Sequence, residues 1–250
     1  MFTLPHFIWL AIVCIIIVGM LYIQKRYHLS FSCVVNIMLT VSIISEVTKI
    51  LCNMEPAPDG RTGMILDPGD LPFHLCSMQI FLLFGLKFLI KSPNTRENLL
   101  GFMAPTMFIG AVLAFFVPTV GVEFTVVQVY QYFIFHAFLV FFSVYIIQQR
   151  LVRWTAKRYI QNVAYLALFA LLAMWINSAL RDVLPRVNFM YLVRPPIDSL
   201  ANYVTSFNSW LIYFLILLAL AFLLIGLFHL CAYNIDKYRD KKKELDELQN

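Results

Sequence analysis

Long apolar stretches alternate with short polar segments along the whole chain. A transmembrane helix needs about 20 mostly apolar residues, because the hydrocarbon core of a bilayer is about 30 Å thick. The pattern therefore predicts an all-α polytopic membrane protein with seven transmembrane helices. We expect the spans at about 7–23, 29–52, 71–90, 98–117, 124–147, 159–180 and 209–233.

The third stretch, residues 71–90, reads LPFHLCSMQIFLLFGLKFLI and has polar side chains gathered at its start. His74 and Cys76 come first, and Gln79 follows about one turn later. Polar groups inside hydrocarbon cost free energy unless they are paired or serve a function. The start of this span is therefore the first candidate for a functional site.

The composition supports a membrane protein without a separate soluble domain. Of the 250 residues, 61% are hydrophobic and 13% are charged, whereas a soluble domain has about 25% charged residues. We expect residues 1–233 to form one transmembrane domain and residues 234–250 to form a charged cytoplasmic tail. The N-terminal segment MFTLPHFIWL lacks a basic region and a small-residue cleavage site, so we interpret it as the start of the first span.

Basic residues set the expected orientation, because cytoplasmic loops are enriched in Lys and Arg. Most of them fall on alternate loops and in the tail: Lys25, Arg26, Lys91, Arg96, Arg150, Arg153, Lys157, Arg158, Lys237, Arg239, Lys241, Lys242 and Lys243. The opposite loops hold Arg61, Arg181, Arg186 and Arg194. The sequence therefore predicts an outside N-terminus and a cytoplasmic C-terminus. We interpret the net charge of +5 as this topology signal and expect no nucleic-acid partner.

The five cysteines are scattered, without the CxxC or CxC spacing of a zinc site or a disulfide framework. They are Cys14, Cys33, Cys52, Cys76 and Cys231. A buried cysteine usually packs as a small hydrophobe, and this is our interpretation of all but Cys52 and Cys76. We expect neither a metal ion nor an organic cofactor.

Several predicted spans place polar side chains at one depth, from the outer surface to the middle of the membrane. Convergence of this kind indicates a buried polar cavity. The side chains are Glu46, Lys49, His74, Cys76, His136 and Asn177.

Helical spacing sorts the polar residues into faces. Gln128, Tyr132 and His136 are four residues apart and share one face of the fifth span. Cys76 and Gln79 are three residues apart and share a face of the third span.

His74 and Cys76 are only two residues apart, so on a regular helix their side chains point roughly 200° from each other. This spacing argues against a metal-binding pair. We interpret His74 as a residue of the outer loop or as a support for the start of the helix.

The chemistry that these residues favour is nucleophilic. A thiolate at Cys76 would attack an acyl carbonyl, and His136 would take up and return the proton. Gln79, Gln128 or Asn177 would donate to the oxyanion, with Tyr132 and Glu46 as further polar support. The structural alternatives remain open: Cys76 as a packing residue, His136 as a hydrogen-bonding residue between helices, and Glu46 with Lys49 as an ion pair that fixes the second span.

Three segments resemble a known family. LPFHLCSMQIFL is similar to the LP-x-HLC motif of the YwaF-like bacterial membrane proteins and of transmembrane protein 164. FIFHAFLV is similar to the family's intramembrane histidine segment, and VNFMYLVRPP resembles its NYMFL-x-x-P stretch. Phe189 and Tyr191 stand in the opposite order to the family's aromatics, which is a mild departure. A more distant similarity is to the androgen-induced gene 1 hydrolases.

The resemblance implies a cysteine-dependent phospholipid acyltransferase or a lipid-ester hydrolase. It places the nucleophile at Cys76 and the intramembrane histidine at His136. Asn188 and Met190 match the third motif, and we count His74, Asn188 and Arg194 as candidates for substrate binding or access.

Two function classes follow from the sequence. The first is an intramembrane acyl-transfer enzyme that takes phospholipid or another acyl lipid from the outer leaflet. The alternative is a non-enzymatic membrane component, either a transporter or a partner subunit of a membrane complex, with a polar cavity for a lipid or a solute. In both cases we expect a multi-pass protein, by its resemblance one of a bacterial cell membrane.

Overall fold

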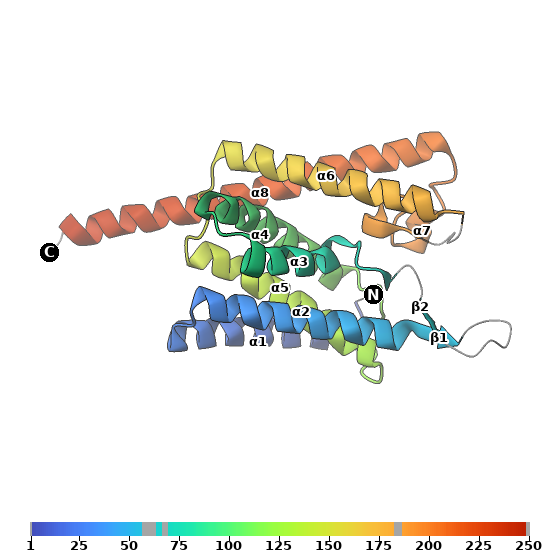
Figure 1. Cartoon of the computed structure of the whole chain (residues 1–250), viewed down its shortest axis with the longest axis horizontal. Coiled ribbons are helices and arrows are strands. Elements are labelled where there is room, and N and C mark those ends of the chain that lie inside the picture. The colour runs from blue at the N-terminus through green and yellow to red at the C-terminus, as the bar shows by residue number, and fades with distance from the viewer. Residues whose placement is uncertain (1, 57–63, 67–69, 183–186, 249–250) are drawn as a thin grey trace.

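The computed structural model describes residues 2–56, 64–66, 70–182 and 187–248, and Figure 1 shows their arrangement. The elements in chain order are α1 (Leu4–Tyr27), α2 (Phe31–Asn53), β1 (Met54–Pro56), β2 (Met64–Leu66), α3 (Leu75–Phe84), the π-helix η3 (Gly85–Leu89), α4 (Pro93–Phe116), α5 (Val127–Gln148), α6 (Ala156–Leu180), the 3₁₀ helix η4 (Phe189–Tyr191), α7 (Asp198–Ala201) and α8 (Phe207–Leu248).

Six helices in the described part of the chain are long and apolar enough to cross a membrane, which confirms the prediction of a helical multi-pass membrane protein. They are α1, α2, α4, α5, α6 and α8. The expected third span is shorter than the hydrocarbon core is thick. The 10 residues of α3 and the 5 of η3 together rise about 22 Å, whereas the hydrocarbon is about 30 Å thick. The count of seven crossings and the orientation stay predictions.

The third helix begins later than its hydropathy indicates because of Pro72. Residues 71–74 form a turn, in which Phe73 N donates to Leu71 O at 2.8 Å, and the helix starts at Leu75 with His74 as its N-cap. A residue that precedes proline is pushed out of the helical region, so Leu71 cannot belong to the first turn. Cys76 consequently lies in the first turn of α3.

The two central helices α4 and α5 pack against each other and hold most of the buried side chains (Figure 1). α1 and α2 pack on α5 on one side, and α6 and α8 pack on α4 on the other. The α4–α5 interior is rich in aromatic rings, among them Phe102, Phe115, Phe133, Phe141 and Phe142. The outer helices keep large apolar side chains exposed, as expected for surfaces that face lipid.

A proline inside α4 explains how α4 is tied to α6 and α8. Pro105 has no N–H, so the carbonyl of Gly101 loses its partner within the helix. The Asn162 side chain of α6 donates to this carbonyl at 2.6 Å and lies 2.7 Å from His229 Nε2 of α8. One amide therefore joins three helices at a fully buried position.

A second, smaller core forms around η4 and α6, from Ala173, Ile176, Val187, Phe189 and Leu192. Asn177 of α6 holds it through two hydrogen bonds to the backbone of Phe189. Its Oδ1 accepts from Phe189 N at 2.8 Å, and its Nδ2 donates to Phe189 O at 3.1 Å. Met190 and Tyr191 have φ values of 57° and 55°, so the chain turns sharply here.

The polar loop expected between the second and third spans contains a short antiparallel pair, in which Met54 pairs with Leu66 and Pro56 with Met64. Asn53 Nδ2 donates to Asp70 Oδ1 at 2.7 Å and so joins the two ends of the loop. Arg61, on which part of the orientation prediction depends, lies outside the described residues.

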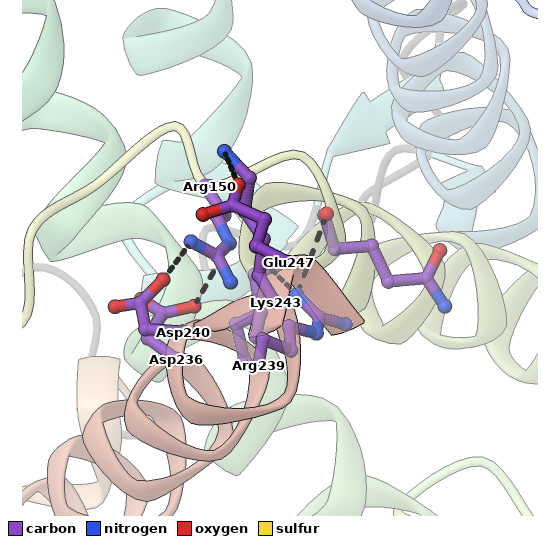
Figure 2. Close-up of polar contacts among 8 residues, drawn as sticks. Arg150, Asp236, Arg239, Asp240, Lys243 and Glu247 are labelled. Atoms are coloured by element: carbon purple, nitrogen blue, oxygen red, sulfur yellow. Dashed lines mark hydrogen bonds and ion pairs between the residues drawn. The ribbon is translucent and has the colours of Figure 1, made fainter. Parts of the chain in front are cut away.

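The cytoplasmic tail expected from residue 234 onward continues α8 without a break and extends beyond the bundle (Figure 1). It is held to the end of α5 by two arginines, as Figure 2 shows. Arg150 pairs with Asp240 and lies 3.9 Å from Asp236, and Arg239 Nη1 donates to Ile147 O at 3.1 Å. A cation at the carbonyl end of a helix is favourable because the last carbonyls have no partner within the helix.

Candidate functional site

Cys76 faces α4 from the first turn of α3. A Cβ atom built on Gly110 would lie 3.3 Å from Cys76 Sγ, so the absence of a side chain at Gly110 gives the sulfur its place. Thr106, Gly110 and Ala114 are four residues apart, and small residues at this spacing let helices approach closely in membranes. Cys76 is half-buried at this contact.

Two tyrosines lie in the same region as the thiol. Tyr132 on α5 packs, like Cys76, against the α4–α5 core, and its Oη donates to the carbonyl of Ala114 at 3.1 Å. Tyr191 in η4 packs against His74, two residues before Cys76. Elements α3, α4, α5 and η4 therefore all contribute to the region of Cys76.

His136 lies one turn after Tyr132, buried in α5. Its Nδ1 is 2.7 Å from the carbonyl oxygen of Tyr132, which only accepts, so Nδ1 carries a hydrogen. In the neutral imidazole, Nε2 therefore keeps its lone pair. The ring packs against Tyr132 with centroids 4.4 Å apart and against Phe115 at 6.3 Å.

Cys76 and His136 come from different helices, and the His136 ring packs against Tyr132. Among the residues that the structure describes, no hydrogen bond joins the sulfur to the imidazole. The Cys–His pair therefore stays a prediction, with His136 oriented by its own helix and Cys76 by the contact with α4.

Glu46 and Lys49 form the ion pair that their spacing in the sequence indicates. Lys49 Nζ lies 2.5 Å from Glu46 Oε1, with both side chains largely enclosed. Ser77 of α3 joins them, because its Oγ donates to Glu46 Oε2 at 3.0 Å and accepts from Lys49 Nζ at 3.3 Å. This network ties α2 to the first turn of α3.

The glutamines expected to support the site differ in their surroundings. Gln79 is fully buried and its Nε2 donates to Thr106 Oγ1 at 3.2 Å, while its Oε1 has no hydrogen-bond partner among the described residues. A further glutamine, Gln131 of α5, donates to Ser45 Oγ of α2 at 2.5 Å and so bonds across helices. Gln128 lies half-buried in the first turn of α5.

The side chains of the asparagines expected near the site form hydrogen bonds with backbone groups. Asn177 uses both ends of its amide on Phe189. Asn188 Oδ1 accepts from Val193 N at 3.0 Å and from Arg194 N at 3.2 Å, and its Nδ2 donates to Arg194 O at 2.8 Å. These two amides build the loop that contains Tyr191, which packs against His74.

His74 lies at the edge of the same loop, and Arg194 is exposed. The His74 ring packs against Phe189 and Tyr191, with centroids 5.5 Å and 5.3 Å apart. His74 thus lies at the start of α3 and packs on η4, and its role stays a prediction. Within the described ranges, no three His, Cys, Asp or Glu side chains are close enough to hold a metal ion.

Sequence reasoning missed four residues of this region: Ser77, Thr106, Gly110 and Tyr191. Gly110 and Thr106 had a signal, namely the spacing of small residues along α4. Tyr191 lies in the VNFMYLVRPP segment that the resemblance singled out, but nothing there indicated its contact with His74. Ser77 had no signal, because a hydroxyl next to a cysteine is common in any chain.

Comparison with known families gives a match over most of the chain. The model of the TMEM164 family matches residues 1–228. This range includes Cys76, His136 and the segment around Asn188, and it ends before the charged part of α8. No curated protein and no solved structure matches the chain.

Proposed function

The chain belongs to the TMEM164 family, and from this premise we propose that it is an intramembrane acyl-transfer enzyme acting on lipid esters. Cys76 is the nucleophile and His136 the general base. The observation that carries the proposal is the Nδ1–H bond of His136 to Tyr132 O, which leaves Nε2 as the basic atom of a ring that packs against Tyr132. A base that is fixed in one tautomer by its other nitrogen is the arrangement that nucleophilic catalysis requires.

In the first half of the reaction, His136 Nε2 takes the proton of the Cys76 thiol and the sulfur attacks the carbonyl of the lipid ester. The C–O bond breaks, the acyl group stays on sulfur as a thioester, and the leaving alkoxide takes the proton from Nε2. In the second half, the hydroxyl of an acceptor lipid gives its proton to Nε2 and attacks the thioester. The C–S bond breaks and the proton returns to sulfur. Water as the acceptor gives hydrolysis.

The start of α3 supplies groups that suit the oxyanion. The first N–H groups of a helix have no partner within the helix and carry its positive end. The His74 side chain makes no cap hydrogen bond to them. Donors of this kind stabilise negative charge that develops on a carbonyl oxygen in a site without water. They replace Asn177 in this role, since its amide is occupied by Phe189.

The test is transfer of a labelled acyl chain from phospholipid to a lysolipid by purified protein in nanodiscs, with mass spectrometry of the peptide that contains Cys76. We expect an acyl adduct on Cys76 in the wild-type protein. In the His136→Gln variant this adduct forms only slowly or not at all. Cys76→Ala abolishes transfer, while Cys33→Ala, a half-buried cysteine of α2, keeps it. A folded Cys76→Ala protein with full transfer activity would overturn the proposal.

A second candidate is a membrane component that binds lipid without chemistry. The observation that favours it is that the sulfur of Cys76 and the ring of His136 share no hydrogen bond within the described part of the chain. This candidate predicts no acyl adduct on any cysteine and the same lipid copurifying with wild-type and Cys76→Ala protein.

A further inference from the structure

One group of charges near the thiol has no role in the reaction as written above. Lys49 of α2 is enclosed together with Glu46, 2.5 Å away, and donates to Ser77 Oγ at 3.3 Å. A lysine that served only to end a span would extend its ammonium group to the membrane surface. Lys49 instead directs its ammonium group into the bundle, toward α3.

The position of this ammonium group relates it directly to Cys76. Ser77 follows Cys76 in the first turn of α3, so the hydrogen bond from Lys49 brings a positive charge to the turn that holds the sulfur. Cys76 itself is half-buried and packs against the apolar core, where an isolated thiolate is costly.

We propose that Lys49 is a positioning residue that stabilises the thiolate of Cys76, and that Glu46 moderates this effect by pairing with Lys49. The inference rests on the proposed function, because it assigns the charge that makes the nucleophile reactive. Ser77 fixes the geometry, since its hydroxyl donates to Glu46 and accepts from Lys49. The thiolate rather than the thiol is the nucleophile, so a nearby cation raises its reactivity.

The competing interpretation is that the network only ties α2 to α3. The two interpretations predict different directions for the change in thiol reactivity when Lys49 or Glu46 is replaced. If the network only ties the helices together, loss of Lys49 and loss of the Glu46 charge both loosen the first turn of α3. Both then change the reactivity of the thiol in the same direction. If Lys49 acts by its charge, loss of the cation makes the thiol less reactive, and loss of the carboxylate charge makes it more reactive.

The experiment measures alkylation of Cys76 by a neutral maleimide in the full chain, in nanodiscs, with the other four cysteines replaced by alanine. We expect Lys49→Met to slow the reaction about threefold to tenfold and Glu46→Gln to accelerate it by a similar factor. Lys49→Arg keeps the rate within about twofold, because the charge remains. Lys87→Met is the matched control, since Lys87 lies in η3 at the opposite end of the same helical segment, and it leaves the rate unchanged.

Changes of the same sign in Lys49→Met and Glu46→Gln, or no change in either, overturn the inference. If Lys49→Met does not fold, Lys49→Gln takes its place, because the comparison needs loss of the cation as well as loss of the carboxylate charge. The acyl adduct on Cys76, measured in parallel, separates this inference from the proposed function. If the two variants change the alkylation rate in opposite directions but no adduct forms, acyl transfer is refuted. If an adduct forms but both variants change the rate in the same direction, the role of Lys49 is refuted.

Discussion

Asn177 offers the sharpest test of how the loop around η4 is built. Replacement by alanine removes both hydrogen bonds to Phe189, whose backbone N–H and C=O then have no partner at this site. Phe189 is fully buried, so water does not readily replace the amide. A buried polar group left without its partner costs about 1–3 kcal/mol, and two such groups give a loss of about 2–5 kcal/mol.

The assay is thermal unfolding of purified protein in one detergent, combined with alkylation of Cys76. We expect Asn177→Ala to lower the unfolding midpoint clearly, and Asn177→Asp to keep the bond from Phe189 N and lose only the bond to Phe189 O. The control is Asn208→Ala, an exposed asparagine at the start of α8, which leaves the midpoint unchanged. A loss of less than about 1 kcal/mol in the free energy of unfolding for Asn177→Ala would refute the reasoning, because the loop would then not depend on this amide.

Four further predictions concern other contacts. Gly110→Val forces a branched side chain against Cys76 Sγ, and we expect a loss of about 1–3 kcal/mol in unfolding free energy and slower alkylation of the thiol. Asn162→Leu leaves the Gly101 carbonyl without its donor, and we expect unfolding to become easier by about 1–3 kcal/mol in chemical denaturation. Arg239→Gln removes the donor to the last carbonyls of α5, so limited proteolysis of the tail becomes faster, whereas the exposed Lys237→Gln does not change it. Screening by high salt should weaken the ion pairs between Arg150 and the tail in wild-type protein.

The sequence predicts the long spans well, because hydrophobic length is fixed by the thickness of the bilayer and needs no tertiary information. It also predicts the ion pair of Glu46 with Lys49, since residues three apart on a helix are neighbours. It does not predict the start of α3. The apolar run begins at Leu71, whereas the backbone restriction imposed by Pro72 delays the helix to Leu75.

The same limit applies to the candidate site. From the sequence, Asn177 has the type and depth of an oxyanion donor, but a loop segment 12 residues further along the chain takes both ends of its amide. Helical periodicity describes which face a side chain occupies and says nothing of which loop folds back onto it. Ser77 escapes prediction for the same reason, because its partners lie on another helix.

The two central groups of the site depend on different parts of the fold. His136 is fixed within α5, since Nδ1 bonds the carbonyl four residues earlier, and this geometry persists wherever α5 stays helical. Cys76 depends on tertiary contacts: the close approach of α3 to α4 at Gly110, the network from α2 to Ser77, and the packing of η4 against His74 just before α3. Changes in packing should therefore act on the reactivity of the thiol before they alter the orientation of the imidazole. The alkylation rate of Cys76 is for this reason the most direct measure of whether α2, α3, α4 and η4 are assembled as the structure describes.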